Sequence, residues 1–196
     1  MQVDYLYNLP DEFRTSAIQL YLNALKDIFE PILGNNHRAQ EALKSNLDTH
    51  KCLVAICDQK LVGILCIGAR EGGFLNPNLK TMAKVYGPIG GALRLGGLAM
   101  LHHPITPGEL YVEGVAVSEN MRGQGIGSQL FDRLENIAVK KGIRTISLEV
   151  VDTNSKTKAL YKRLGFVVTK QRKIWPLNLF IKFQFKSTVF MVKNLC

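Results

Sequence analysis

Three glycines and an arginine stand close together in the stretch "MRGQGIGSQLF", residues 121–131, just before an apolar pattern of helical period. The first N–H groups of a helix have no partner within it, and the helix dipole attracts negative charge to that end. Glycine lets a ligand approach the backbone closely because it has no side chain. An ordinary tight turn would explain one glycine, but Gly123, Gly125 and Gly127 together with Arg122 favour a bound phosphate group.

The two common phosphate loops do not fit this stretch. A dinucleotide-binding G-x-G-x-x-G loop that begins at Gly123 needs a glycine at position 128, which is Ser128. The nucleotide-binding pattern G-x-x-x-x-G-K-[ST] does not occur in the chain. The sequence therefore favours a third type of phosphate loop.

The spacing Arg122-x-x-Gly125-x-Gly127 resembles the [QR]-x-x-G-x-[GA] pyrophosphate loop of the GNAT superfamily, the Gcn5-related N-acetyltransferases. The preceding "YVEGVAV" resembles the fourth strand of that family, and "SLEVVDTN" followed by "ALYKRLGF" resembles its fifth strand and fourth helix. These matches cover residues 109–168, in the family's order and near its usual spacing. One position departs from the pattern, because Thr157 stands where alanine is usual.

The resemblance implies acetyl-coenzyme A (acetyl-CoA) as the donor and a primary amine as the acceptor. Pantetheine would lie between splayed fourth and fifth strands, against the backbone of Val115, Ala116 and Val117. Asn154 would bind the pantetheine amides while also capping a helix, and Lys158 or Arg163 would meet a coenzyme phosphate. The pyrophosphate would lie on residues 122–128, which are Arg122, Gly123, Gln124, Gly125, Ile126, Gly127 and Ser128.

Two side chains are candidates for the chemistry. An alkylamine with a pKa near 10.4 arrives mostly protonated, so a base must take its proton before it attacks the thioester. Alternation along the strand is expected to put residues 111, 113, 115 and 117 on one face, with Glu113 beside Tyr111 and near the thioester. In the resembling proteins an acid or histidine lies at this point, and a tyrosine that corresponds to Tyr161 protonates the leaving thiolate. An ion-paired strand carboxylate and a half-buried core tyrosine are the structural alternatives.

Other side chains are weaker candidates. Glu149, His102 and His103 are the next choices for the base, although the two histidines lie in a Gly- and Pro-rich stretch and are expected to be ordinary loop residues. The four cysteines have no histidines at metal-ligand spacing, so no metal site is expected. Three of them lie in apolar runs, which favours buried thiols in a reducing cytoplasm.

The elements that position these residues alternate between strands and helices, which predicts an α/β fold in a single domain of residues 1–196. The family resemblance implies a mixed, mostly antiparallel sheet of six to seven strands, with helices on both faces and splayed central strands. Residues 71–108 are expected to form an inserted apolar loop with helical turns. The predicted strands cover residues 3–7, 52–57, 61–69, 109–117, 145–151, 166–174 and 179–192; the predicted helices cover 11–31, 37–48, 126–142 and 154–164.

Composition leaves the acceptor open. A hydrophobic fraction of 46% with 21% charged residues is typical of a globular protein, and neither a signal peptide nor a membrane span is expected. The net charge of +9, with no acidic residue after Asp152, allows a basic nucleic-acid-binding surface, but no nucleic-acid motif occurs. A catalytically silent CoA-binding regulatory domain is the main alternative to an enzyme. The acceptor is a small molecule or a peptide, and the last strand allows a homodimer.

Overall fold

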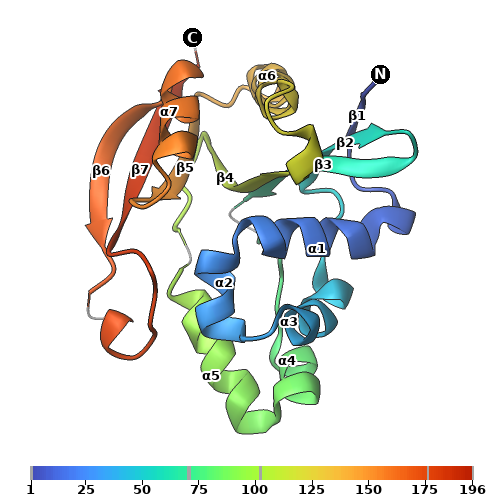
Figure 1. Cartoon of the computed structure of the whole chain (residues 1–196). Helices are drawn as coiled ribbons and strands as arrows, with labels where there is room; N and C mark the ends of the chain where they lie inside the picture. The colour runs from blue at the N-terminus through green and yellow to red at the C-terminus, as the bar shows by residue number, and fades with distance from the viewer. Residues whose placement is uncertain (1, 70–71, 102, 176, 196) are drawn as a thin grey trace.

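The computed structural model describes residues 2–69, 72–101, 103–175 and 177–195, and Figure 1 follows the chain through them. The strands form a seven-stranded sheet in the order β1-β2-β3-β4-β5-β7-β6. Neighbouring strands are antiparallel except β4 and β5, which are parallel. The predicted mixed sheet is therefore confirmed. The strands are β1 (Asp4–Tyr7), β2 (Cys52–Cys57), β3 (Lys60–Gly68), β4 (Glu109–Val117), β5 (Thr145–Val151), β6 (Val167–Lys173) and β7 (Ser187–Asn194).

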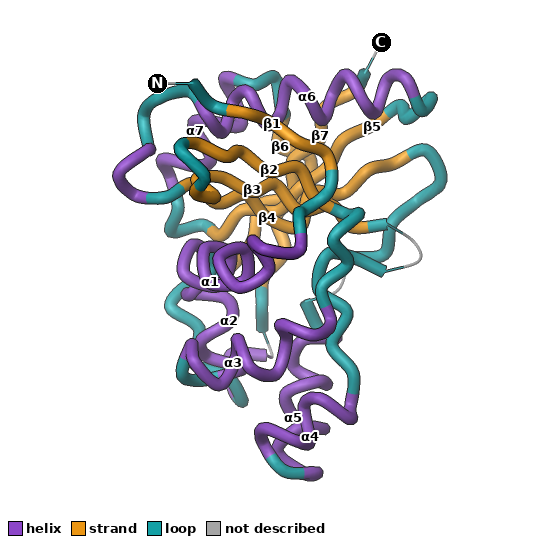
Figure 2. Tube along the Cα trace, turned by 90° about the vertical axis from the view of Figure 1, so that its right-hand side faces the viewer, coloured by secondary structure: helices purple, strands orange, loops and turns teal. Residues whose placement is uncertain are grey.

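Helices cover both faces of this sheet, as Figure 1 and Figure 2 show. The helices α6 and α7 lie on one face, where Leu130, Phe131 and Leu134 are buried against the sheet. The helices α1 to α5 lie on the other face, where α1 and α3 supply most of the helical side chains in a second core. The helices are α1 (Arg14–Ala24), α2 (Lys26–Leu33), α3 (Asn36–Leu43), α4 (Leu79–Tyr86), α5 (Pro88–Ala99), α6 (Ile126–Lys140) and α7 (Ser155–Arg163).

The predicted helix over residues 11–31 is divided in the structure. A short 3-10 turn (Asp11–Phe13) precedes α1, and the chain changes direction at Leu25, where φ is −111° and ψ is 26°. The change of direction brings the Leu25 side chain against Gly114 of β4, where an added Cβ would lie 2.6 Å from Leu25 Cδ1. The helix α2 then runs along a different axis from α1 (Figure 1).

Residues 71–108 hold more regular structure than the expected helical turns. They contain α4 and α5, which pack against each other. An added Cβ at Gly91 would lie 2.7 Å from the Ala83 backbone N, so this glycine lets the two helices approach closely. The many glycines in this stretch led us to predict a loop, but Gly91 instead allows two helices to pack closely. No helix in the described ranges is long and apolar enough to cross a membrane.

The predicted hairpin at residues 52–69 is confirmed, but the last strand begins later than predicted. The turn between β2 and β3 has two left-handed residues, Asp58 and Gln59, which suit the twist of a tight hairpin. Residues 179–186 alternate like a strand, yet β7 starts only at Ser187. Ile181 and Phe183 instead pack against the core on the α1–α5 face, whereas Leu179 and Phe180 are exposed.

Candidate active site

The site begins where β4 and β5 separate. Their parallel pairing runs from Glu109 opposite Thr145 to Val112 opposite Leu148, and no further pair forms between these two fully described strands. Glu113 and Glu149 are therefore the first residues beyond the fork, one on each strand. The β4 backbone at residues 113–117 keeps β3 as its partner on one side and is open toward the fork on the other.

A β-bulge at Glu113 changes which residues share a face. Cys66 of β3 pairs with Gly114 and Ile67 pairs with Val112, so Glu113 is the extra residue on β4. Tyr111 and Glu113 line the same cavity on the α1–α5 face, as expected. The expectation that residues 115 and 117 share that face is wrong, because Val115 and Val117 pack with the α6 core after the bulge. Strict alternation from the sequence does not anticipate an extra residue.

The carboxylate of Glu113 is held against the loop of residues 72–76. The Phe74 N–H donates to Glu113 Oε2 over 2.9 Å. An added Cβ at Gly73 would lie 1.7 Å from Glu113 Oε1, and one at Gly68 would lie 3.2 Å from it, so two glycines make room for this group. Burial raises the pKa of Glu113 to about 7, although the Phe74 N–H and the positive charge of Lys51 oppose the rise. A carboxyl group with this pKa can accept or hold a proton near neutral pH.

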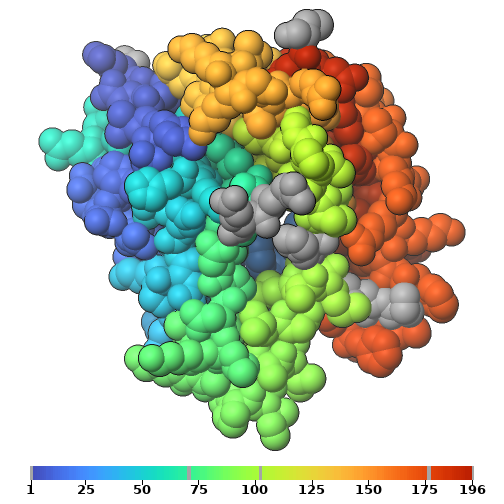
Figure 3. Space-filling view, turned by 180° about the vertical axis from the view of Figure 1, so that it is seen from behind, coloured from blue at the N-terminus to red at the C-terminus, as the bar shows by residue number. Residues whose placement is uncertain are grey.

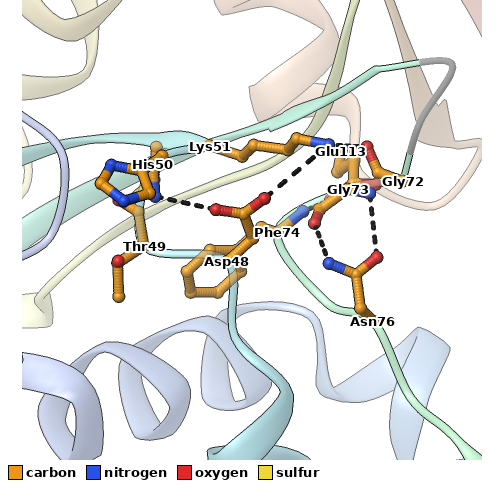
Figure 4. A network of polar contacts seen from close by, with 10 residues as sticks. Asp48, Thr49, His50, Lys51, Gly72, Gly73, Phe74, Asn76 and Glu113 are labelled. Carbon is orange, nitrogen blue, oxygen red and sulfur yellow. Dashed lines mark hydrogen bonds and ion pairs between the residues drawn. The ribbon is translucent and has the colours of Figure 1, made fainter.

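Side chains around this loop fix its shape (Figure 4). Lys51 Nζ donates to the Gly72 carbonyl over 2.7 Å and lies 3.8 Å from Asp48 Oδ2. Asn76 Nδ2 donates to the Gly73 carbonyl over 2.8 Å, and its Oδ1 accepts from the Gly73 N–H over 3.3 Å. The sequence reasoning missed Lys51, Gly73 and Asn76, and the adjacent glycines at 72 and 73 were the one signal that pointed to this position.

The glycine turn leads into α6 as predicted. Gly123 and Gly125 have φ of 79° and 81°, in the left-handed region that favours glycine. An added Cβ at either residue would meet nothing within 4 Å. Within the described ranges, no residue accepts a hydrogen bond from the backbone N–H groups of residues 123–128. Arg122 is exposed, and its Nε donates to the Val117 carbonyl over 3.2 Å, which ties the turn to the end of β4.

The remaining predicted residues come from α7 and its start. Tyr161 is buried among Phe131 and Phe166, at ring-centroid distances of 5.6 and 6.0 Å, and burial raises its pKa. It lies on the α6–α7 face, across the sheet from Glu113. Asn154 caps α7, because its Oδ1 accepts from the Thr157 N–H over 3.1 Å. Lys158 is half-buried on the same helix.

His103 makes more side-chain contacts than we expected for an ordinary loop residue. Its ring stacks on Tyr111 and Phe190, at centroid distances of 4.7 and 4.8 Å. Its Nε2 lies 3.4 Å from Glu109 Oε1 and its Nδ1 lies 3.9 Å from Glu149 Oε1. The structure thus joins two of the secondary candidates, His103 and Glu149. The third, His102, lies outside the described residues.

Glu109 is a member of this cluster that the sequence reasoning missed. Ser147 Oγ donates to Glu109 Oε1, and the Thr106 N–H and hydroxyl donate to Oε2 over 2.9 and 2.6 Å. Burial alone would raise the pKa of Glu109, but these hydrogen bonds and His103 outweigh it and lower the pKa. Glu109 is therefore an ionised, fully engaged carboxylate that holds His103, whereas Glu113 titrates near neutral pH.

A cavity of about 620 Å³ opens beside Glu113. Figure 3 shows the molecule hollowed between the green segment that leads into α4 and the yellow-green segment that follows α5. Glu113, Glu149, Tyr111 and His103 line one part of the cavity, and apolar side chains from α2 and α5 line much of the rest. Neither Tyr161 nor residues 122–128 are among its lining residues. Tyr161 and the glycine turn therefore lie apart from this cavity.

Comparisons with known proteins agree with this geometry. The model of the acetyltransferase (GNAT) family matches residues 17–166. The thialysine N-epsilon-acetyltransferase of Sus scrofa is 40% identical over 60 residues, which are 31% of this chain and 35% of that protein. The match thus spans about a third of that relative's length.

Solved structures share the fold over the whole chain. An N-acetyltransferase from Staphylococcus aureus Mu50 has a TM-score of 0.63 at 15% identity, with 100% of both chains covered. A Bacillus subtilis acetyltransferase, solved in complex with CoA, has a TM-score of 0.57 at 17% identity and covers 100% of this chain and 99% of its own. The resemblance that rests on Arg122, Gly125 and Gly127 is confirmed by the family match. The chain belongs to the GNAT family of acetyltransferases.

Proposed function

We propose that this chain, acting as a single domain, transfers the acetyl group of acetyl-CoA to a primary amine. One observation carries the proposal: a part-buried carboxyl group, Glu113, stands at the first open position of the β4–β5 fork, on the strand that leads through the glycine turn into α6. The pig relative is named for acetylation of an ε-amine, which supports an amine acceptor. The Bacillus subtilis structure contains CoA, which supports the donor.

The proposed coenzyme site uses backbone more than side chains. Gly123 and Gly125 leave open space at the start of α6, so the turn has room for a pyrophosphate that a Cβ would obstruct. The N–H groups of residues 123–128 would donate to the phosphate oxygens, and Arg122 would add positive charge. The open backbone of Val115, Ala116 and Val117 would pair with pantetheine. Asn154 uses its Oδ1 as a helix cap, so its Nδ2 group is the part that would donate to a pantetheine carbonyl.

Glu113 is proposed as the general base. The acceptor ammonium gives one proton to the carboxylate, directly or through a water molecule, and the neutral nitrogen attacks the thioester carbonyl carbon. A C–N bond forms, the C–S bond breaks, and the sulfur leaves with the electron pair as a thiolate. A base with a pKa of about 7 is ionised above neutral pH and can still release the proton to solvent afterwards.

Tyr161 is proposed to act on the leaving sulfur. A coenzyme thiol has a pKa near 8.5, so the thiolate needs little help. Burial raises the pKa of Tyr161 above its ordinary value, which makes the phenol a weaker acid. Its main contribution is therefore a hydrogen bond to the sulfur, with proton return to follow from the tyrosine or from solvent. This role is expected to be smaller than that of Glu113.

The proposal is tested in two stages with the purified chain. Titration calorimetry and thermal unfolding with acetyl-CoA should show binding, with a stability gain of about 1.4 kcal/mol for each tenfold excess of ligand over its dissociation constant. A panel of primary amines should then release free CoA in a thiol-detection assay. Absence of binding at millimolar acetyl-CoA contradicts the whole proposal. Binding without CoA release from any amine would favour the regulatory alternative, a CoA-binding domain without catalysis.

A further inference from the structure

The cavity on the acceptor side of the fork has two chemically different parts. Glu113 and Glu149 lie at the fork, so an ammonium group that enters there meets carboxyl groups from both strands. His103 also lines this part, but its nearest partner is Glu109, at 3.4 Å. The fork end is therefore suited to one cationic nitrogen.

A second part of the cavity has an apolar wall. It is formed by Leu25, Ile28 and Phe29 from the α1–α2 region and by Leu95, Leu98 and Leu101 from α5 and its end. The two sides of this wall are in contact, because an added Cβ at Gly97 of α5 would lie 3.0 Å from Ile32 of α2. Phe29 is further held by the ring of Tyr21, at a centroid distance of 5.7 Å. This wall is a packed surface that can bury an apolar group of a ligand.

The only other charged lining residues in the described parts of the chain are cationic. Arg172 and Lys173, at the end of β6, line the cavity next to Ile174 and Trp175. Asp152, just after β5, is already engaged by the N–H and hydroxyl of Ser187, which is the β7 partner of Lys173. A second ammonium on the acceptor would meet apolar side chains on one wall and positive charge on the other. Both contacts disfavour it.

We propose that the acceptor is a primary monoamine whose nitrogen is joined to a bulky apolar body that packs against the cavity-lining side chains of α2 and α5. This inference rests on the proposed acetyl transfer and adds the class of substrate. It excludes diamines and polyamines as preferred acceptors, because the described lining away from the fork offers no carboxylate partner to a distal ammonium.

A matched pair of amines tests the inference. 1-Hexylamine and 1,6-diaminohexane have the same chain length and differ only in the second ammonium. We expect kcat/KM for hexylamine to exceed that for the diamine by at least tenfold at pH 8, and 3-phenylpropylamine to match or exceed hexylamine. Equal values, or a preference for the diamine, would overturn the inference while leaving acetyl transfer intact.

Two leucines of α5 provide the variant and its control. Leu95 is half-buried and lines the cavity, whereas Leu93 on the same helix is 71% exposed and is not among the lining residues. Leu95→Asp should lower kcat/KM for hexylamine at least tenfold and narrow or reverse the preference over the diamine. Leu93→Asp should change neither value by more than twofold. Equal effects of the two variants contradict the assigned wall, and Leu95→Asn serves the same comparison if the aspartate variant fails to fold.

Binding can be followed without catalysis, because the chain has a single tryptophan and it lines the cavity. Hexylamine should change the fluorescence of Trp175 at concentrations at least tenfold lower than 1,6-diaminohexane does, in the presence of CoA. If neither amine is acetylated but this difference persists, acetyl transfer fails and the binding preference stands. If both amines are acetylated equally well and bind equally, the inference alone fails.

Discussion

The two sides of the β4–β5 fork are built from different kinds of group. The proposed coenzyme side, residues 115–128, is one continuous stretch that presents backbone N–H groups at a glycine turn. The acceptor side, the cavity beside Glu113, is assembled from side chains of segments far apart in the sequence. A site that binds through backbone N–H groups needs its glycines for any acceptor. A site that binds through side chains can accept substitutions in its lining without a change of fold. The proposed coenzyme side therefore carries the features that mark the family, and the proposed acceptor side would determine the substrate specificity of this chain.

The largest expected effect tests the chemistry on the acceptor side. Glu113→Gln keeps the shape of the side chain but cannot take a proton, so turnover should fall by roughly 10²–10⁴ at pH 8. The deficit should narrow below pH 7, where the wild-type carboxyl group is itself protonated, because the pKa of Glu113 is about 7. It should narrow again toward a pH of about 10, where the amine is already neutral. Rates of the wild type and the variant with one amine, measured across this pH range, test both the low-pH and the high-pH narrowing.

Glu30→Gln is the control for this variant, since Glu30 is an exposed carboxylate on α2. It should leave the profile unchanged. If Glu113→Gln retains near-normal turnover across the range, the base lies elsewhere, and the His103–Glu149 pair is the next group to change.

The coenzyme side is tested by Gly127→Val. An added Cβ at Gly127 meets only Val117, at 4.0 Å, so the helix should keep its fold while the branched side chain occupies the space in front of the free N–H groups. Loss of charge-assisted hydrogen bonds worth about 3 kcal/mol in total corresponds to roughly 100-fold weaker acetyl-CoA binding. Gly125 is a poorer choice, because its φ of 81° would strain any other residue.

Gly96→Val is the matched control for this change. Like Gly127, Gly96 is a glycine within a helix, and an added Cβ there meets nothing within 4 Å. It lies on α5, away from the turn. Calorimetry should give an unchanged dissociation constant for it, and circular dichroism should give similar helix content for both variants. Equal loss of binding in the two would mean that helix stability, and not space at the turn, controls affinity.

The same contrast explains what the sequence could predict. The glycine spacing of residues 123–127 and the strand "YVEGVAV" encode local geometry, so the sheet, the fork and the turn follow from them. The contact of Gly73 with Glu113 and the stacking of His103 on Phe190 join residues that are far apart in the sequence, which no local pattern records. The bulge at Glu113 was also not predicted, because one extra residue on a strand leaves the alternation of apolar residues almost unchanged. Packing glycines of α5, such as Gly91, were indistinguishable in sequence from loop glycines.

A third prediction measures what burial of Glu113 costs the fold. A pKa raised from 4.5 to about 7 means that the ionised form favours the unfolded state. The contribution of Glu113 to stability is fully present below its unfolded pKa and is lost as pH rises through about 7. Glu113→Gln has no charge to bury, so its free energy of unfolding should exceed that of wild type by up to about 3 kcal/mol at pH 8 and be near equal at low pH.

Urea unfolding at pH 4.5 and pH 8 measures this difference, with Glu30→Gln again as the control. A variant that gains no stability between the two pH values would mean that the carboxylate is not buried in solution. The same measurement separates the two sides of the fork, because substitutions at the exposed glycine turn are not expected to raise the free energy of unfolding between pH 4.5 and pH 8.

The smallest expected effect concerns Tyr161, which is buried in the α6–α7 layer. Tyr161→Phe keeps the ring that packs against Phe131 and Phe166, so stability should change by no more than about 1 kcal/mol. Only the hydrogen bond to the leaving sulfur is lost, and turnover should fall by less than about tenfold. The loss should grow as pH rises, because solvent acid then no longer returns a proton to the thiolate. Rates for Tyr161→Phe and for Tyr7→Phe, an exposed tyrosine on β1, should be compared from pH 6.5 to 9. A deficit as large as that of Glu113→Gln would make proton return to sulfur, and not proton removal from the amine, the step that this site controls.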